Sequence, residues 1–256
     1  MSSPCPKCGY VRKPSDAELN PLICPACGIA YNKWLARQKG VVPQHARVSR
    51  SIDEDEKSSF QNILEAITYV PEHVEIIEFY ARAITFIGLL IWGFKFIIGG
   101  IDWELIMGSF MHNINLPFHE FGHVLFMPFG KFMHILGGSL FQVALPFGLM
   151  LAFIFQRRDN FAASVMLWWT GQSFIDVSPY IADANYRMLP LVGGASEEFH
   201  DWGNLLTMMN MLSSARKIAN VSFGIGTLLI LLSFVWGAYI LYRQRKNIGQ
   251  VAVDVK

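Results

Sequence analysis

Long runs of apolar residues dominate the chain from about residue 81 onward, whereas the first 60 residues are mostly polar. A helix needs about 20 predominantly apolar residues to cross a bilayer. Five segments approach this length: 83–101, 105–127, 136–155, 161–181 and 218–242. The pattern predicts an all-α polytopic membrane protein with about five transmembrane helices within residues 81–245, followed by a polar tail at 246–256.

The segment from Phe60 to Tyr80 has apolar residues at helical spacing with acidic residues between them, and Pro71 interrupts it. We expect an amphipathic helix that approaches the membrane surface, so that residues 41–80 form a linker and an approach helix. The N-terminus has no basic stretch followed by an apolar run. This predicts that no signal peptide is cleaved and that the head lies in the cytoplasm.

Composition fits an integral membrane protein and argues against one class of partner. The chain is 52% hydrophobic and 16% charged, and its formal net charge is +1. Proteins that bind nucleic acid usually carry a basic excess. No nucleic-acid partner is therefore expected, and the lipid bilayer is the expected environment.

All four cysteines of the chain lie in the head, as two C-x-x-C pairs. Cys5 and Cys8 form the first pair, and Cys24 and Cys27 form the second after fifteen intervening residues. This spacing matches a four-thiolate zinc site, and a glycine after each pair permits the left-handed backbone of a tight turn. Two disulfides are the alternative, which a cytoplasmic head disfavours. The sequence predicts a zinc ribbon over residues 1–40, folded by a structural zinc ion.

The run His119-Glu120-Phe121-Gly122-His123 places three ionisable side chains inside an apolar segment. Positions i and i+4 share one face of a helix, so the two histidines can bind one zinc ion while Glu120 activates a water beside it. Ionisable groups at bilayer depth are costly and are kept mainly for function. The alternative is a pair of structural histidines at an interface. The pattern favours a second, catalytic zinc site with Glu120 as its base.

A catalytic zinc ion takes a third protein ligand and leaves one position for water. With five spans and a cytoplasmic head, segments 105–127 and 161–181 run parallel, so Asp176 falls at the depth of the histidines in the cytoplasmic half. Asp176 is therefore the first candidate for the third ligand. It could instead cap a helix or pair with Lys95. The rival ligands are Asp183, His200 and His112.

These residues resemble the site-2 protease group of intramembrane zinc metalloproteases, the M50 peptidases, over about 105–183. The specific part of the resemblance is the H-E-x-x-H run. It implies a zinc ion bound by His119, His123 and Asp176, with Glu120 as general base, and a membrane-embedded or membrane-proximal peptide or protein as substrate. The family usually has Asp-Gly at the third ligand, whereas Val177 follows the aspartate here. The head resembles short zinc ribbons of many bacterial proteins, which implies a bacterial inner membrane.

The segment after the motif is the place where the family can form a re-entrant, strand-like element that receives the substrate. The pair Gly137-Gly138 would allow such irregular backbone. An ordinary turn between helices is the alternative.

Two questions stay open from the sequence. Five spans place Arg157, Arg158 and the basic run at 243–246 on the side opposite the head, against the positive-inside tendency. A re-entrant hairpin at 136–155, or a half-helix at 205–212, would change that arrangement. The function could also be that of a non-peptide membrane zinc hydrolase or of a noncatalytic ribbon-headed scaffold, although zinc binding alone does not need Glu120.

Overall fold

The computed structural model describes residues 4–16, 19–31, 34–35, 59–189 and 200–249. The chain divides into two units, Met1–Phe60 and Gln61–Lys256, and each is described by itself. The described residues form helices, turns and two isolated backbone bridges, with no strand among them. Most of the predicted linker, including its acidic run at 53–56, and the end of the predicted tail lie outside the described residues.

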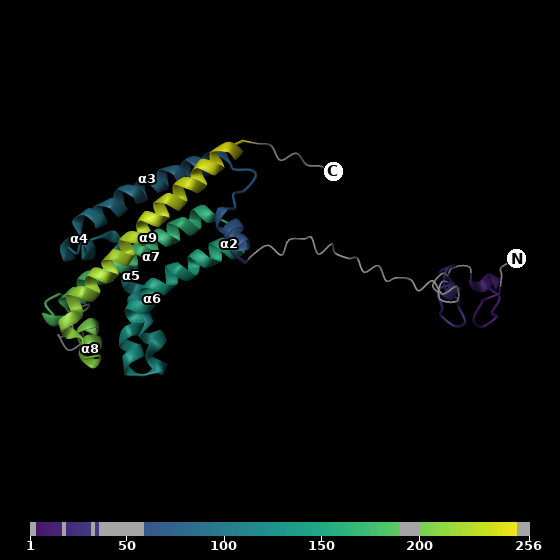
Figure 1. Ribbon diagram of the computed structural model, residues 1–256, viewed down its shortest axis with the longest axis horizontal. Helices are drawn as coiled ribbons and strands as arrows, with labels where there is room; N and C mark the ends of the chain where they lie inside the picture. The colour runs from purple at the N-terminus through teal and green to yellow at the C-terminus, as the bar shows by residue number, and fades with distance from the viewer. Residues whose placement is uncertain (1–3, 17–18, 32–33, 36–58, 190–199, 250–256) are drawn as a thin grey trace. The chain divides into compact units, whose positions relative to one another are not determined.

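The larger unit is a bundle of helices joined by short connections (Figure 1). Its elements in chain order are α2 (Ser59–Thr68), α3 (Ile76–Gly99), α4 (Trp103–Met107), α5 (Phe110–Phe126), η2 (Met127–Phe129), α6 (Lys131–Ala152), η3 (Phe153–Arg157), α7 (Asn160–Ala182), η4 (Asp183–Asn185), α8 (Asp201–Met208), η7 (Leu212–Ser214), α9 (Ala215–Gln244) and η8 (Arg245–Asn247). The predicted approach helix appears as α2, which ends before Pro71. The residues after that proline start α3 instead.

Side-chain caps decide where several of these helices begin. The Ser109 side chain accepts a hydrogen bond from the backbone N–H of His112 and starts α5, so the predicted segment 105–127 is cut in two. The 17 residues of α5 rise about 1.5 Å each and therefore cover about 25 Å, which is less than the hydrocarbon thickness of about 30 Å. We conclude that α5 is short for a complete membrane crossing.

Among the described residues, three helical stretches are long and apolar enough to cross a membrane: Ile76–Gly99, Lys131–Arg157 and Leu212–Asn247. They correspond to the first, third and fifth predicted segments, although the first begins earlier than expected. The count of five spans is therefore not confirmed. The fourth segment forms α7, which is long enough but is less apolar because it carries many polar residues.

α7 lies between α6 and α9 and packs most extensively on α9. Its buried polar residues are Asn160, Ser164, Thr170, Gln172, Ser173, Asp176 and Ser178. Polar groups in a membrane protein are tolerated where they face the bundle interior. The enclosed position of α7 thus explains why its sequence is more polar than that of its neighbours.

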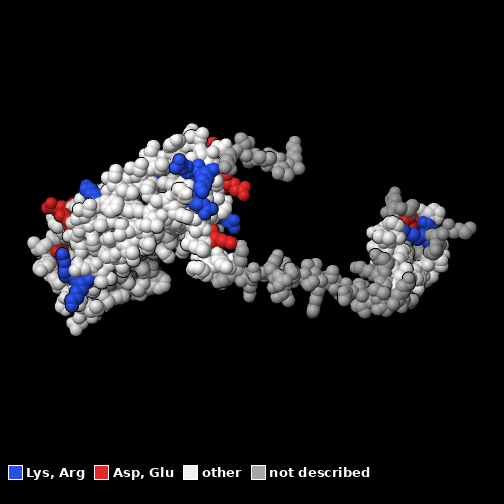
Figure 2. All heavy atoms as spheres, turned by 45° about the horizontal axis from the view of Figure 1, so that its top comes forward, with Lys and Arg blue, Asp and Glu red and all other residues white. Residues whose placement is uncertain are grey.

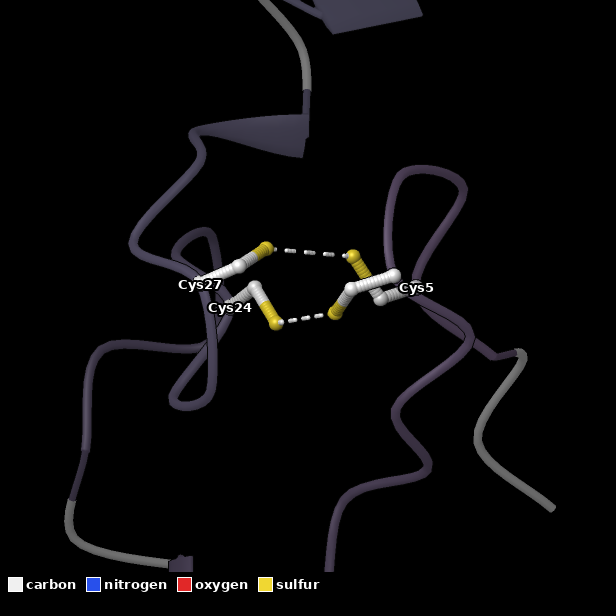
Figure 3. Close-up of side chains that lie close together, drawn as sticks. Cys5, Cys24 and Cys27 are labelled. Atoms are coloured by element: carbon white, nitrogen blue, oxygen red, sulfur yellow. Dashed lines mark hydrogen bonds between the residues drawn. The ribbon is translucent and has the colours of Figure 1, made fainter.

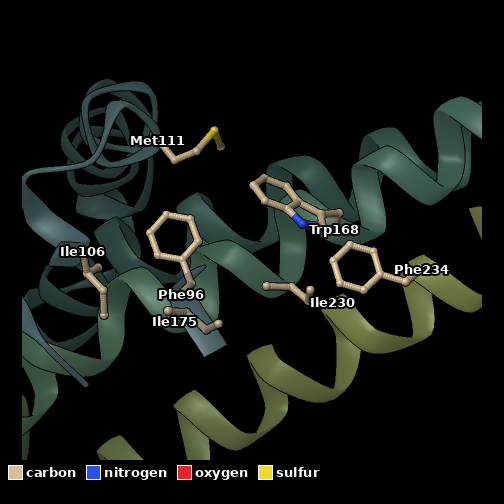
Figure 4. Packing of buried hydrophobic residues seen from close by; sticks show 7 residues of the cluster. All are labelled: Phe96, Ile106, Met111, Trp168, Ile175, Ile230 and Phe234. Carbon is tan, nitrogen blue, oxygen red and sulfur yellow. The ribbon is translucent and has the colours of Figure 1, made fainter. Parts of the chain in front are cut away.

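The centre of the bundle is an apolar cluster to which α3, α4, α5, α7 and α9 contribute (Figure 4). It contains Phe96, Ile106, Met111, Trp168, Ile175, Ile230 and Phe234. Beside it, α7 and α9 approach closely at two glycines: a Cβ atom added to Gly171 would lie 2.7 Å from the carbonyl oxygen of Gly226. Small residues that let helix backbones touch are typical of packing in membranes, where van der Waals contact drives association.

The contacts between helix ends show which ends share a side of the bundle. Arg82 near the start of α3 pairs with Asp159 at the start of α7, at 2.8 Å. Val74, before α3, forms a backbone bridge with Ile248, after α9. Ile101, two residues after the end of α3, packs with the end of α7 and the start of α9. The starts of α3 and α7 and the end of α9 therefore lie at one end of the bundle, which we call the α2 end.

Charged side chains gather toward both ends of the larger unit, and the face between them in Figure 2 is mostly free of them. The exposed basic residues at the α2 end are Arg157, Arg158, Arg243, Arg245 and Lys246. Arg158 lies over the ring of Tyr69, and Lys246 lies over that of Tyr242. Aromatic and basic residues are enriched at membrane interfaces. Both basic clusters thus lie at the same end as α2.

This arrangement predicts the labelling of introduced cysteines by a membrane-impermeant maleimide. Arg158→Cys and Arg245→Cys should react from the same membrane face as Glu72→Cys, and Glu104→Cys should react from the other face. Peptide mapping by mass spectrometry separates these sites from the four cysteines of the head. Five spans would instead put Glu104→Cys and Arg158→Cys on the same face, so that result would contradict the bundle.

Candidate metal centres

The head brings its four cysteine side chains together (Figure 3). The Sγ atoms of Cys5 and Cys27 are 3.8 Å apart, and those of Cys8 and Cys24 are 3.7 Å apart. Two sulfurs that bind a tetrahedral zinc ion at about 2.3 Å are about 3.8 Å from each other. All four cysteines are free rather than joined in disulfides. The geometry therefore fits the predicted structural metal site.

The turns that carry these cysteines are built alike. The N–H of Gly9 donates to the carbonyl oxygen of Cys5 at 2.8 Å, and the N–H of Gly28 donates to that of Cys24 at 2.9 Å. The φ angles of the two glycines are 71° and 69°, in the left-handed region that side chains disfavour. The prediction that each glycine closes a tight turn is confirmed.

Backbone groups in its own turn favour the thiolate form of Cys24. Burial acts to raise its pKa, but hydrogen bonds from the backbone N–H groups of Cys27 and Ala26 stabilise the thiolate and lower the pKa to about 6. The thiolate, not the thiol, binds metal. Neutral pH thus favours metal binding in the head, and acid opposes it.

A second group of ligands forms inside the larger unit from His119, His123 and Asp201. The Nε2 atom of His119 lies 3.1 Å from Oδ2 of Asp201, and the Nε2 atom of His123 lies 3.3 Å from the same oxygen. Ligands that bind a tetrahedral zinc ion at about 2.0–2.1 Å are about 3.3 Å apart. The two histidines and one carboxylate fit the ligand set of a catalytic zinc site, which keeps a fourth position for water.

The remaining ring nitrogens of the histidines have partners that fix how each ring binds. Nδ1 of His119 lies 3.0 Å from Oε1 of Gln142, and Nδ1 of His123 lies 2.8 Å from the backbone oxygen of His134. Because these oxygens only accept hydrogen bonds, each Nδ1 carries the proton and each Nε2 keeps its lone pair. In the neutral ring, both Nε2 atoms thus keep the lone pair that binding a metal ion needs.

Glu120 and Tyr180 complete the surroundings of this group. Glu120 follows His119 directly in α5, and its side chain is exposed. The Tyr180 hydroxyl accepts a hydrogen bond from the backbone N–H of Asp201 at 2.9 Å. It also lies 3.4 Å from Oδ2 of that residue. Tyr180 therefore holds the start of α8 against the histidines.

Asp176, the predicted third ligand, is not in this group. Its two carboxylate oxygens each lie 3.2 Å from Nδ1 of His112, and Oδ2 accepts a hydrogen bond from Nε2 of Gln142 at 2.7 Å. The rivals Asp183 and His200 lie next to each other, with 3.3 Å between Oδ2 and Nε2. The structure brings Asp201 to the histidines because α8 packs against α6 and α7.

Little in the sequence indicated Asp201 as a candidate ligand. It is separated from His119 by 82 positions, and no fixed spacing connects a histidine pair to a carboxylate at the start of a distant short helix. Gln142 and Tyr180 were missed for a related reason, since each is a single polar residue in an apolar or mixed segment. Helical periodicity did find the pair on α5, because its two members are four residues apart.

Gly137 and Gly138 lie within α6, so they form neither the expected strand-like element nor the alternative, a turn between helices. The turn that joins α5 to α6 lies earlier, at η2. The absence of a side chain at Gly138 has a clear role. A Cβ atom there would lie 2.6 Å from Nε2 of His119 and 2.6 Å from Nε2 of His123. Glycine fits this position because the Nε2 atoms of both histidines approach the α6 backbone.

Gly138→Ala is accordingly expected to weaken zinc binding by His119, His123 and Asp201, a group that we call the membrane site. Forcing an extra methyl group into a packed site costs about 1–3 kcal/mol, which corresponds to roughly a 5- to 150-fold loss of affinity. The measurement is zinc affinity in detergent by chelator competition. Gly148→Ala on the same helix is the matched control, since a Cβ atom there meets nothing within 4 Å. Equal affinities in the two variants would contradict the prediction.

Neither a family model, a curated protein nor a solved structure matches the chain. The function must therefore be argued from the chemistry of the two metal centres and from the helices that hold them.

Proposed function

We propose that the protein is an intramembrane zinc-dependent endopeptidase of the site-2 protease type. In this proposal His119, His123 and Asp201 bind the catalytic zinc ion and Glu120 is the general base. The observation that carries the proposal is the convergence of the H-E-x-x-H histidines with a carboxylate, that of Asp201, at zinc-ligand distances. The described part of this unit also has three helices of membrane-spanning length. The resemblance of the same run to the M50 peptidases supplies the reaction class.

In the proposed reaction, each group of the site has a separate role. A zinc ion bound there supplies a Lewis acid that polarises a carbonyl group and makes a water more acidic. Glu120 takes the proton from the attacking water and then returns it to the leaving amine. Its carboxylate is exposed on the surface of the helical unit. His119 and His123 are held as the tautomers that bind metal, so the site needs little rearrangement.

The head has a different part in this proposal. Four thiolates leave no open position on a zinc ion, so the metal at Cys5, Cys8, Cys24 and Cys27 is structural. We place the protein in a bacterial inner membrane with the head in the cytoplasm, where reducing conditions keep thiols available for metal. The substrate is a membrane-embedded or membrane-proximal peptide segment.

The proposal is tested with the full chain reconstituted in liposomes. The probe is a library of transmembrane peptides that carry a fluorophore and a quencher on either side of the apolar segment. Wild type should cleave members of the library, and His119→Ala/His123→Ala should not, while it keeps the zinc ion of the head. Cleavage by both proteins, or by neither, would overturn the proposal. Lipid hydrolysis measured in the same liposomes would then identify a non-peptide hydrolase.

A further inference from the structure

A buried carboxylate that the proposed reaction does not use lies behind the membrane metal site. Asp176 is 5% exposed and lies on the enclosed helix α7. An ionisable group in such a position is expensive unless it has partners and a role. Its partners are His112 on α5 and Gln142 on α6, so three helices meet at this carboxylate.

These contacts form a chain that reaches a metal ligand. The Gln142 amide donates from Nε2 to Asp176 at 2.7 Å, and its Oε1 lies 3.0 Å from Nδ1 of His119. Gln142 is 4% exposed, so protein groups and not bulk water decide how its amide is turned. A carboxylate only accepts hydrogen bonds, and it therefore makes the amide present Nε2 to Asp176 and Oε1 to His119.

The direction of the amide decides the state of His119. An oxygen facing Nδ1 requires a proton on Nδ1, which leaves the lone pair on Nε2 for metal. An amide turned the other way would present Nε2 to the ring, place the ring proton on the metal-facing nitrogen and oppose metal binding. His112, whose Nδ1 is 3.2 Å from both oxygens of Asp176, holds the carboxylate in place.

We propose that Asp176 and Gln142 are positioning residues of the membrane metal centre: Asp176 orients the Gln142 amide, and Gln142 sets the metal-binding tautomer of His119. This inference rests on the metal site of the proposed function, but not on peptide hydrolysis. Asp176 thus acts on the metal through Gln142 and without touching it.

The test is zinc affinity of the full chain in detergent, measured by chelator competition. Because all four cysteines belong to the head, a thiol reagent reports release of the head's zinc ion, and zinc released without new thiol reactivity comes from the membrane site. Gln142→Leu should lower the affinity of the membrane site by about 10- to 100-fold, as is typical for residues that support metal ligands. Asp176→Leu should also lower the zinc affinity of the membrane site.

The double variant separates positioning from packing. If Asp176 acts only through Gln142, then Asp176→Leu/Gln142→Leu should bind zinc no more weakly than Gln142→Leu alone. The exchanged pair Asp176→Asn/Gln142→Glu should restore affinity, because the new carboxylate accepts from both His119 and the new amide while the volumes are kept. The inference would be overturned if the affinity losses of the two single variants multiplied in Asp176→Leu/Gln142→Leu. It would also be overturned if Asp176→Asn/Gln142→Glu did not recover zinc affinity.

Asn115→Leu is the matched control. Asn115 is a buried amide on α5 that donates to Gln172 at 2.8 Å and accepts from the indole of Trp169, so it joins the same helices without reaching the ligands. Its removal should lower thermal stability and leave zinc affinity unchanged. An equal loss of affinity in this variant would show that packing alone matters and would overturn the inference. A wild-type chain with zinc only in the head would overturn the metal centre itself, and this inference with it.

Discussion

Asp201→Asn is expected to lower the zinc content of the purified protein from two ions per chain to one. The amide keeps the shape of the carboxylate but loses its charge, and it is a poor zinc ligand. A four-ligand structural site binds zinc with about 10–16 kcal/mol, so one ligand is worth roughly 2.5–4 kcal/mol, or on the order of 100- to 1,000-fold in affinity. Elemental analysis after dialysis against a weak chelator measures the loss.

The controls for Asp201→Asn are substitutions of Asp183 and Asp176, the two acidic residues that the sequence analysis considered as the third ligand. Asp183→Asn should keep both zinc ions, since Asp183 binds His200 and the backbone N–H of Leu189 instead of the metal-binding histidines. Asp176→Asn should retain more zinc than Asp201→Asn in the same dialysis, because Asp176 acts on the site only through Gln142. Retention of both ions in Asp201→Asn together with loss in Asp176→Asn would restore Asp176 as the third ligand.

Glu120→Gln is expected to abolish hydrolysis while both zinc ions stay bound. General acid–base catalysis contributes about 10²- to 10⁴-fold, and an amide cannot take the proton of the attacking water. Cleavage of the transmembrane peptide library in liposomes measures the rate, and elemental analysis of the same preparation measures the metal. The combination of full zinc content with lost activity separates the base from the ligands.

Glu104→Gln is a suitable control for Glu120→Gln, because Glu104 is an exposed acid on α4, outside the ligand group. It should cleave the library at the wild-type rate. Wild-type cleavage by Glu120→Gln would rule out Glu120 as the base. If zinc disappeared together with activity, Glu120 would have to hold the site together, and the proposed role would again fail.

The parts of the site that the sequence predicted are those set by local geometry. The histidines of α5 are one helical turn apart, and each cysteine pair lies in one tight turn, so spacing alone places their ligand atoms together. The structure brings both sets to zinc-ligand distances. The helical class followed from apolar runs in the same way, since it depends on neighbouring residues and not on distant contacts.

The third ligand could not be predicted because it depends on packing between distant elements. The sequence argument matched the depths of two helices that were both taken as complete spans. In the structure Asp176 contacts α5 at His112, seven residues before His119. The cap at Ser109 shortens α5, and α8 then supplies the carboxylate from beyond α7. Neither the cap at Ser109 nor the position of α8 produces a periodic pattern in the sequence.

The enclosed, polar character of α7 has a consequence for how the protein is made. A carboxylate at the centre of a bilayer costs about 2.5–3.5 kcal/mol when a single helix is inserted, so α7 gains little by entering lipid alone. Its main packing partner, α9, and the residue that completes the ligand set, Asp201, are both synthesised after it. Assembly must therefore wait for the last quarter of the chain, and a chain that ends before it lacks part of the ligand group.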